Sequence, residues 1–341
     1  MNRIAALMAL FAASCVAPPA PGPADDAGGA PFTLQARPLA LSTAELDGAQ
    51  LGPFRFVSAA HLTAAGPGAA GFGGLSSLAR EGEAWRAISD AGATLRFPLS
   101  IDGQGRITAF GVGAAAAGAI APIRGPDARP LRGEAEVDAE GLTAAPDGGW
   151  FISLERHHRL LRIPRDSWAG PSMAGPPQTG FDGLAPNGGM EALERLADGR
   201  LLAIAEYGQT GQAGAPPYWL VAPAETAPAA PAGVFAVPDG FGVTEARVQG
   251  DLLWLLLRKF DPGTGRLDVK LQRCPLDGVV AGAPRCETAL TLAPPFVMDN
   301  YEGLALLPDP AGRGTLFLVL SDDNFSATQR TLALTFLLPG G

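Results

Sequence analysis

Positively charged residues are scarce in this 341-residue sequence. Lys and Arg number 25 against 34 Asp and Glu, which gives a formal net charge of −9. Such a chain lacks the basic surface on which nucleic-acid binding depends, so we expect no nucleic-acid partner. Charged residues of both signs make up only 17% of the chain, which argues against a coiled coil or a helical bundle.

Several motifs of enzyme chemistry are also missing. The chain has three His and three Cys, no Cys-x-x-Cys pair and no Gly-x-Ser-x-Gly elbow. These absences argue against a zinc site and against an α/β-hydrolase nucleophile. No glycine-rich phosphate loop opens a helix, so nucleotide binding is not expected.

The longest uninterrupted apolar run lies at the N-terminus and is too short to span a bilayer as a helix. Residues 1–14 read as a lipoprotein-type signal peptide, in which small residues lead to Cys15 as the lipidation site. An ordinary export signal is the alternative. The Pro/Ala/Gly-rich residues 15–31 predict a flexible tether, and residues 32–341 the folded domain. We expect the periplasmic face of a bacterial outer membrane or the periplasm, with the lipid as the only membrane contact.

The two remaining cysteines are Cys274 and Cys286, twelve residues apart with a turn-like Asp-Gly between them. Export to an oxidising compartment favours a structural disulfide between them, with free buried thiols as the alternative.

Glycine and proline are abundant, at 45 and 32 residues, and much of that content falls in a repeat. A leading apolar strand, a polar Gly turn and a second apolar strand that ends in a charged residue recur five times. The acids that lead four of these repeats are Glu140, Glu191, Glu245 and Glu302. The successive intervals between them are 51, 54 and 57 residues. Periods near 50 that are built from short strands indicate the blades of a β-propeller.

We therefore predict an all-β fold, a β-propeller of about six blades with four antiparallel strands each. The sixth blade would combine strands near residues 32–57 with residues 331–338, so that the N- and C-terminal strands close the ring. Five or seven blades remain open, and a two-domain β-sandwich is the alternative. We expect a monomer.

The repeats place acids at equivalent positions. The leading acids are Glu140, Glu191 and Glu302, and the acids that end the second strand are Asp90, Glu155, Glu206 and Asp322. Their neighbours are Asp138, Asp299, Asn300, Asp323 and Asn324. Carboxylates gathered at one channel mouth repel one another unless protons or a cation neutralise them, and an oxygen-only donor set favours calcium. The alternative is that the acids pair with arginines and cap turns.

Candidate cationic groups are few. Arg156 follows Glu155, Arg258 takes the place of the strand-end acid in its repeat, and the set also contains Arg80, Lys259 and Arg330. Arginines beside a bound cation would clamp a phosphoryl group. Neutralising the neighbouring acids is the alternative role.

The motifs GGLSSL (73–78), AEGLTAAPDGGWFISLER (139–156) and NGGMEALERLADGRLLAIAE (187–206) resemble the phytase-like ("esterase-like activity of phytase") family. DNYEGLALLPD (299–309) and SDDNFSATQRTLALTF (321–336) carry the same resemblance most specifically. It covers roughly residues 45–338, and it implies a propeller in secreted or envelope proteins.

Two functions follow. The first is an envelope hydrolase that cleaves small ester or phosphate ester substrates with the help of calcium. Its catalytic groups would be Glu140, Glu191, Glu302 and Arg330, its substrate-binding groups Arg156, Arg258 and Lys259, and its metal ligands Asp90, Glu155, Glu206, Asp299, Asp322 and Asp323. The second is a non-catalytic propeller lipoprotein that binds a ligand or a protein partner.

Overall fold

The computed structural model describes residues 29–40, 48–108, 117–165, 169–176, 181, 183–208, 215–222, 231–294 and 296–340. The predicted signal peptide and Cys15 lie outside these residues. Strand β1 begins at Ala30, inside the range predicted as a tether. Helices in the described part are short: η1 (Ala69–Gly71), α1 (Glu134–Val137) and α2 (Leu276–Val280). None of the described helices is long and apolar enough to cross a membrane.

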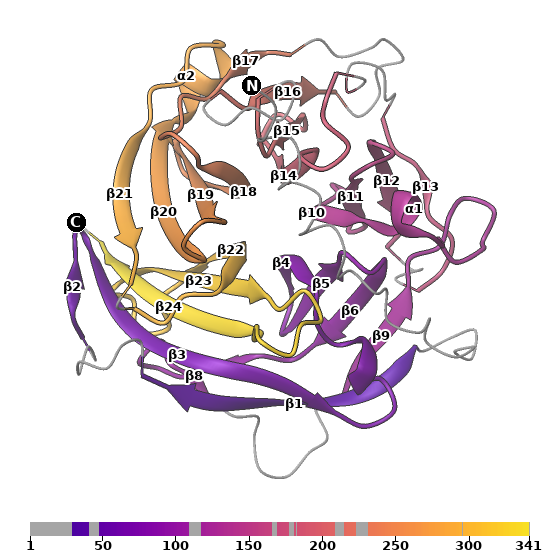
Figure 1. Ribbon diagram of the computed structural model, residues 1–341, viewed down its shortest axis with the longest axis horizontal. Coiled ribbons are helices and arrows are strands. Elements are labelled where there is room, and N and C mark those ends of the chain that lie inside the picture. The colour runs from indigo at the N-terminus through magenta and orange to yellow at the C-terminus, as the bar shows by residue number, and fades with distance from the viewer. Residues whose placement is uncertain are drawn as a thin grey trace.

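Three separate four-stranded sheets form the middle of the chain, each built from consecutive antiparallel strands (Figure 1). The first is β10 (Ala139–Ala144), β11 (Trp150–Leu154), β12 (Arg159–Ile163) and β13 (Met173–Ala174). The second is β14 (Met190–Arg195), β15 (Leu201–Ala205), β16 (Pro217–Val221) and β17 (Gly233–Val234). The third is β18 (Gly242–Gln249), β19 (Leu252–Asp261), β20 (Arg266–Pro275) and β21 (Glu287–Leu292).

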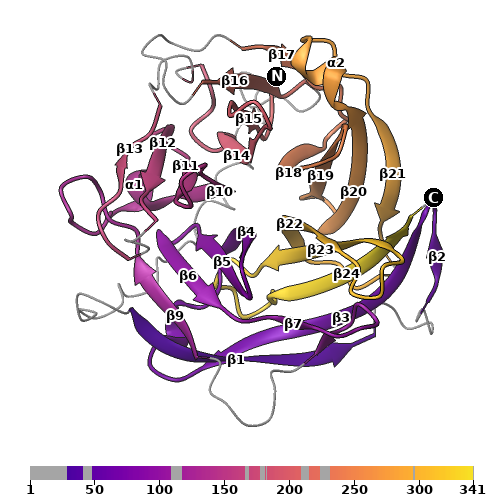
Figure 2. The same cartoon turned by 180° about the vertical axis from the view of Figure 1, so that it is seen from behind.

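A larger sheet contains two more blades that share an outer strand. One blade is β22 (Asn300–Pro308), β23 (Gly314–Asp322), β24 (Leu332–Pro339) and β3 (Phe54–Ala65). The other is β4 (Leu75–Glu81), β5 (Ala84–Ser89), β6 (Ala93–Phe97) and β9 (Ala117–Pro122). Strand β1 (Ala30–Leu39) pairs with both β3 and β9, and Figure 2 shows it along the outside of the two blades. The short strands are β2 (Gln50–Leu51), β7 (Ser100–Ile101) and β8 (Ile107–Thr108).

Five inner strands surround the axis in the described residues. Strands β4, β10, β14, β18 and β22 each pack against two of the others, and the ring closes from β22 back to β4. The fold is therefore a propeller of five blades rather than the expected six. The expected sixth blade is in fact the outer half of the last repeat, because β24 and β3 add to β23 instead of starting a new sheet. Closure by strands from both ends of the chain is confirmed by the β24–β3 pairing.

The space between the blades is filled with apolar side chains. In the blade that begins with β18, residues 252–257 form a continuous apolar run because both faces of the sheet are covered. Trp254 packs edge-on against Phe54 and Phe317, with ring centroids 5.7 and 4.8 Å away. These contacts join the blade of β18 to the closing blade, which fixes the inner strands around the axis.

The predicted disulfide is confirmed. Cys274 lies at the end of β20 and is bonded to Cys286, just before β21. The bond closes the loop that carries α2, on the outer side of this blade (Figure 1).

Candidate functional site

All five inner strands carry a register shift at the same place. The pairing with the second strand of each blade slips between Leu75 and Ser77, and at the equivalent points of the other four blades. A bulge of this kind re-aims the extra side chain. The bulged residues are Ser76, Glu140, Glu191, Thr244 and Glu302. The three leading glutamates predicted from the repeats therefore do occupy one level of the channel.

A second level is formed where the second strand of each blade ends. Each residue of this level pairs through its backbone with the residue that lies two positions before the bulge of the same blade. For example, the N–H of Glu155 donates to the backbone oxygen of Asp138, and the N–H of Glu206 to that of Gly189. The five members are Asp90, Glu155, Glu206, Arg258 and Asp322. Four acids and one arginine thus form the end level, as the repeats predicted. We call the bulge level and this end level, together with Asp138 and Asn300, the acidic mouth.

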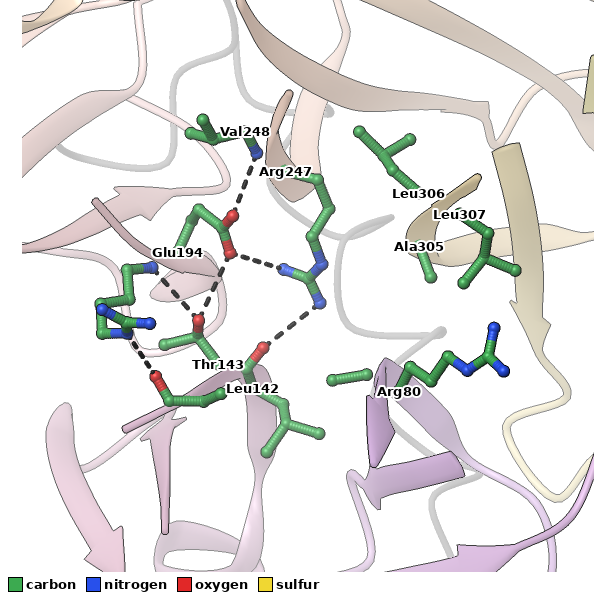
Figure 3. A pocket seen from close by; sticks show the side chains of 12 residues that line it. Arg80, Leu142, Thr143, Glu194, Arg247, Val248, Ala305, Leu306 and Leu307 are labelled. Atoms are coloured by element: carbon green, nitrogen blue, oxygen red, sulfur yellow. Dashed lines mark hydrogen bonds and ion pairs between the residues drawn. The ribbon is translucent and has the colours of Figure 1, made fainter. Parts of the chain in front are cut away.

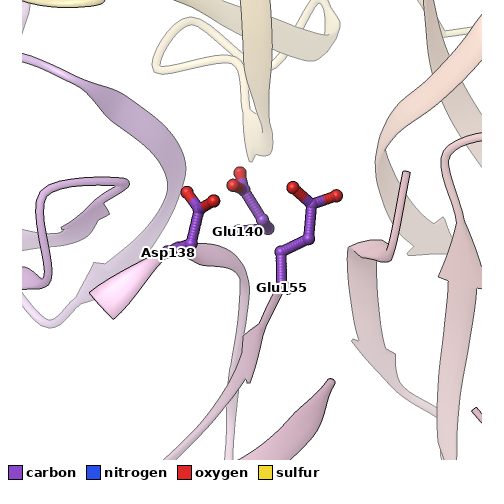
Figure 4. Close-up of side chains that lie close together, drawn as sticks. All are labelled: Asp138, Glu140 and Glu155. Carbon is purple, nitrogen blue, oxygen red and sulfur yellow. The ribbon is translucent and has the colours of Figure 1, made fainter. Parts of the chain in front are cut away.

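Three carboxyl groups of the acidic mouth converge. Asp138, Glu140 and Glu155 each offer an oxygen within 4.8 Å of the others, and Figure 4 shows the three side chains pointing into the same space. All three residues are buried. The carboxyl group of Glu140 makes no hydrogen bond or ion pair with any described residue, and the same is true of the carboxyl group of Glu191. An oxygen-only set of buried carboxylates fits a hard cation such as calcium and does not fit softer metals.

Glu155 is held in place by backbone. Its Oε1 atom accepts hydrogen bonds from the N–H groups of Gly188 and Gly189, the latter at 2.6 Å. Since one oxygen faces the backbone, the other is left for the centre of the cluster.

Two arginines neutralise part of the acidic mouth. The Nη2 atom of Arg258 lies 2.8 Å from Oε1 of Glu206, and its Nη1 atom contacts Glu302 and Asn300. Arg156 donates from Nε to Asp138 at 2.5 Å and pairs with the exposed Glu134 at 2.8 Å. The salt-bridge alternative is therefore realised for Glu206, Glu302 and Asp138, and it does not extend to Glu140 or Glu191.

Burial raises the pKa of six carboxyl groups of the acidic mouth. Burial, followed by the charges of nearby carboxylates, raises the pKa of Asp90 to about 7. Burial also raises the pKa of Glu155 to about 8, although two backbone N–H groups oppose it, and that of Glu302 to about 7. The pKa values of Glu140, Glu191 and Asp322 rise well above their ordinary values for the same two reasons. A cation placed among these groups would displace protons near neutral pH.

Two predicted cationic residues lie apart from the acidic mouth. Lys259 donates from Nζ to the backbone oxygen of Asp239 at 3.1 Å, because it follows Arg258 in the strand and so faces the other way. Arg330 is 41% exposed and lies beside Asp299, at 3.8 Å from Nε to Oδ2. The structure thus brings neither one to Glu140 or Glu191.

Two predicted metal ligands stabilise turns instead. Asp299 accepts hydrogen bonds from the backbone N–H of Asn300 at 3.0 Å and of Arg330 at 3.1 Å. Asp323 accepts from the backbone N–H of Gly74 at 2.9 Å and from the hydroxyl of Thr331 at 3.0 Å. Both oxygens of each carboxyl are therefore engaged in holding loops.

The fourth repeat differs from its prediction. The bulge falls at Thr244, so Glu245 lies one residue deeper in the channel than the leading acids of the other blades. Arg247 holds Glu245 with two contacts of 2.8 Å, and Ser77 also donates to this carboxylate. We call Ser77, Glu245 and Arg247 the plug. The displaced acid in Thr-Glu-Ala-Arg was the one available signal for it.

The plug closes the channel by joining strands. Arg247 of β18 donates to the backbone oxygens of Leu78 in β4 at 3.0 Å and of Leu142 in β10 at 3.2 Å. It also donates to that of Leu193 in β14 at 3.3 Å. Arg247 therefore ties three of the other inner strands together and forms a floor beneath the acidic mouth.

The fold and the site together define a five-bladed propeller with a buried, oxygen-lined acidic mouth. The family model Phytase-like (esterase-like activity of phytase) matches residues 70–325, and the chain belongs to this family. No curated protein matches the sequence.

Solved structures with low sequence identity also resemble the chain. A proposed gluconolactonase is 15% identical with a TM-score of 0.41, over 91% of this chain and 90% of the other. A proposed oxidoreductase (glucose dehydrogenase) from Thermus thermophilus is 14% identical with a TM-score of 0.39, over 91% and 98%. A luciferin-regenerating enzyme is 9% identical with a TM-score of 0.36, over 78% and 92%. None of these scores reaches 0.5, so the fold assignment rests on the strand topology described above.

Proposed function

We propose that this protein is a hydrolase of phosphate esters that works at the acidic mouth with a bound divalent cation, calcium foremost. The observation that carries the proposal is the excess of buried carboxyl groups over arginines, since the carboxyl groups of Glu140 and Glu191 make no hydrogen bond or ion pair with a described residue. Membership of a family described by esterase-like activity of phytase supports the reaction class.

Asp138, Glu140 and Glu155 would hold the ion, since their oxygens already converge. A bound divalent cation polarises a phosphoryl oxygen and lowers the pKa of a coordinated water. Burial and the neighbouring carboxylates raise the pKa of Glu191 well above its ordinary value. A cation bound beside Glu191 would displace the proton of this carboxyl group, and the carboxylate, whose pKa is raised, would then be suited to take a proton from water on one of its oxygens.

Arg258 supplies the positive charge on the other side of the mouth. Its guanidinium is oriented by Glu206 at 2.8 Å and by Glu302, so both N–H faces are fixed before a substrate arrives. A phosphate ester would bind by sharing these donors, with Arg156 at the rim beside Asp138.

The test is calcium-stimulated release of phosphate from phytate and from p-nitrophenyl phosphate. We expect Glu191→Gln to lower kcat by roughly 100-fold or more, the usual contribution of a general base, while circular dichroism stays that of the wild type. The exposed Glu83→Gln is the matched control. Phosphate release that does not depend on calcium, or that is equal in wild type and Glu191→Gln, would refute the catalytic proposal.

A ligand-binding protein without catalysis is the second candidate. It is favoured by one observation: Arg258 and Arg156 are already committed to ion pairs with acids of the same mouth. Calcium found by elemental analysis and phytate binding without turnover would decide for this candidate. An unchanged melting temperature in chelator, with no metal found, would decide against a cation in either case.

We also propose that the protein is exported and anchored by lipid at Cys15. The Cys274–Cys286 disulfide supports an oxidising compartment. Palmitate labelling that is lost in Cys15→Ala is the expected result, and equal labelling of both chains would contradict it.

A further inference from the structure

The propeller axis has a second opening at the other end of the inner strands. A cavity of about 260 Å³ is lined by residues from all five of these strands, each lying several positions after the bulge. Its polar lining is Arg80, Thr143, Glu194, Arg195 and Arg247, and we call it the arginine mouth. Along β14, Arg195 lies four positions after Glu191 of the acidic mouth, roughly 13 Å of extended strand.

The charge of this cavity is opposite to that of the acidic mouth. Three guanidinium groups face one carboxylate, Glu194, which accepts from the backbone N–H of Val248 at 3.0 Å and from Thr143 at 3.3 Å. Arg247 lies 3.8 Å from Glu194 and forms the floor, where it belongs to the plug (Figure 3). Since Glu245 already neutralises one guanidinium from below, the cavity keeps one net positive charge.

Two of the arginines have donors to offer. Arg80 uses Nε for the backbone oxygen of Gly82 at 2.8 Å, and Arg195 uses Nε for that of Ala144 at 2.9 Å. The Nη1 and Nη2 groups of both make no hydrogen bond or ion pair with any described residue. Figure 3 shows Arg80 across the cavity from Glu194, with its guanidinium group pointing away from that carboxylate.

The other walls are apolar. Leu142, Val248, Leu306 and Leu307 line the cavity together with small alanines. Its volume lies below the roughly 300–1,000 Å³ of sites for drug-sized ligands, so the occupant must be small. A single net positive charge matches a monoanion, and the apolar walls match a short hydrocarbon body rather than a fully hydrated phosphate.

We propose that the arginine mouth is a binding site for a small organic monoanion, a carboxylate with a short apolar body. The carboxylate accepts from the Nη groups of Arg80 and Arg195, and the hydrocarbon part lies against Leu306 and Leu307. The plug separates this site from the acidic mouth, so the proposal does not rest on the proposed function.

The test is isothermal titration with hexanoate as the probe, with 1-hexanol, hexylammonium and inorganic phosphate as comparisons. We expect saturable hexanoate binding at least tenfold tighter than that of the other three. The double variant Arg80→Gln/Arg195→Gln should weaken hexanoate binding at least tenfold, about 1.4 kcal/mol. Both side chains lie at the surface end of the channel, so the fold should persist.

Further variants locate the site. Ala144→Phe fills the rim of the cavity from an exposed position and should also weaken binding tenfold. The exposed Arg285→Gln is the matched control and should bind as the wild type does, as should Glu191→Gln in the acidic mouth.

Three results would overturn the proposal. The first is absent hexanoate binding. The second is hexanol or phosphate binding as tightly as hexanoate. The third is hexanoate binding that survives the double variant or is lost in Glu191→Gln, since it would then occur elsewhere in the molecule.

Discussion

Replacing Asp90 by Asn tests the electrostatics of the acidic mouth. Asp90 belongs to the end level, and burial together with the charges of Glu302 and Asp138 raises its pKa from 3.8 to about 7. The folded state therefore binds this proton more tightly than the unfolded state does. The contribution of Asp90 to the free energy of unfolding is fully present below about pH 3.8 and is lost as the pH rises through about 7. Asn is similar in shape and cannot ionise, so the variant escapes this loss.

The magnitude follows from the pKa change. Each pKa unit corresponds to about 1.4 kcal/mol, so the full loss is about 4 kcal/mol, of which roughly 3 kcal/mol falls between pH 5 and pH 8. In the presence of a chelator, we expect the free energy of unfolding of Asp90→Asn relative to the wild type to rise by roughly 3 kcal/mol between pH 5 and pH 8.

Urea unfolding at pH 5 and pH 8 measures the difference. Asp251→Asn, in the exposed turn between β18 and β19, is the control and should follow the wild type at both pH values. Adding calcium chloride should restore the wild type at pH 8 and so reduce the advantage of the variant, because the ion takes the place of the protons. A stability difference between Asp90→Asn and wild type that is equal at both pH values would refute the reasoning.

Two further predictions concern the fold. Arg247→Met should destabilise the protein by roughly 3–5 kcal/mol, because it leaves Glu245 buried without its partner, and the double variant with Glu245→Gln should recover part of this in thermal unfolding. Replacing Cys274 and Cys286 by Ser should lower the free energy of unfolding by about 3 kcal/mol, the value for a closed loop of this length. An Arg247→Met protein as stable as the wild type, or equal stability of the Cys variant and the wild type without reductant, would contradict the respective prediction.

The propeller could be predicted because each blade repeats the same local sequence pattern of short apolar strands and glycine turns. Asp-Gly turns such as Asp147-Gly148 and Asp198-Gly199 mark the first hairpin of a blade, and both glycines have positive φ as such turns require. The number of blades could not be predicted in the same way. Whether residues 54–65 and 332–339 start a sheet or extend one depends on edge pairing with β23, which no local pattern encodes.

The place of a side chain around the axis could be predicted where the residue keeps its position in the repeat. Glu140, Glu191 and Glu302 share the bulge, and sequence spacing alone brought them together. The fourth repeat misled because a slip of one residue along a strand turns a side chain to a different environment, and only the register distinguishes Thr244 from Glu245. Arg330 belongs to a specific motif, yet its loop carries it to Asp299.

The position of Arg247 determines how the acidic mouth can work. Its guanidinium contacts Glu245 of its own strand and backbone oxygens of β4, β10 and β14, so the channel is closed across most of the ring. If the proposed function holds, a substrate would enter the acidic mouth, and its products would leave it, on the side away from Arg247. The arginine mouth lies beyond this floor. Because carboxyl groups dominate on one side of Arg247 and guanidinium groups on the other, the two proposed sites would bind ligands of opposite charge.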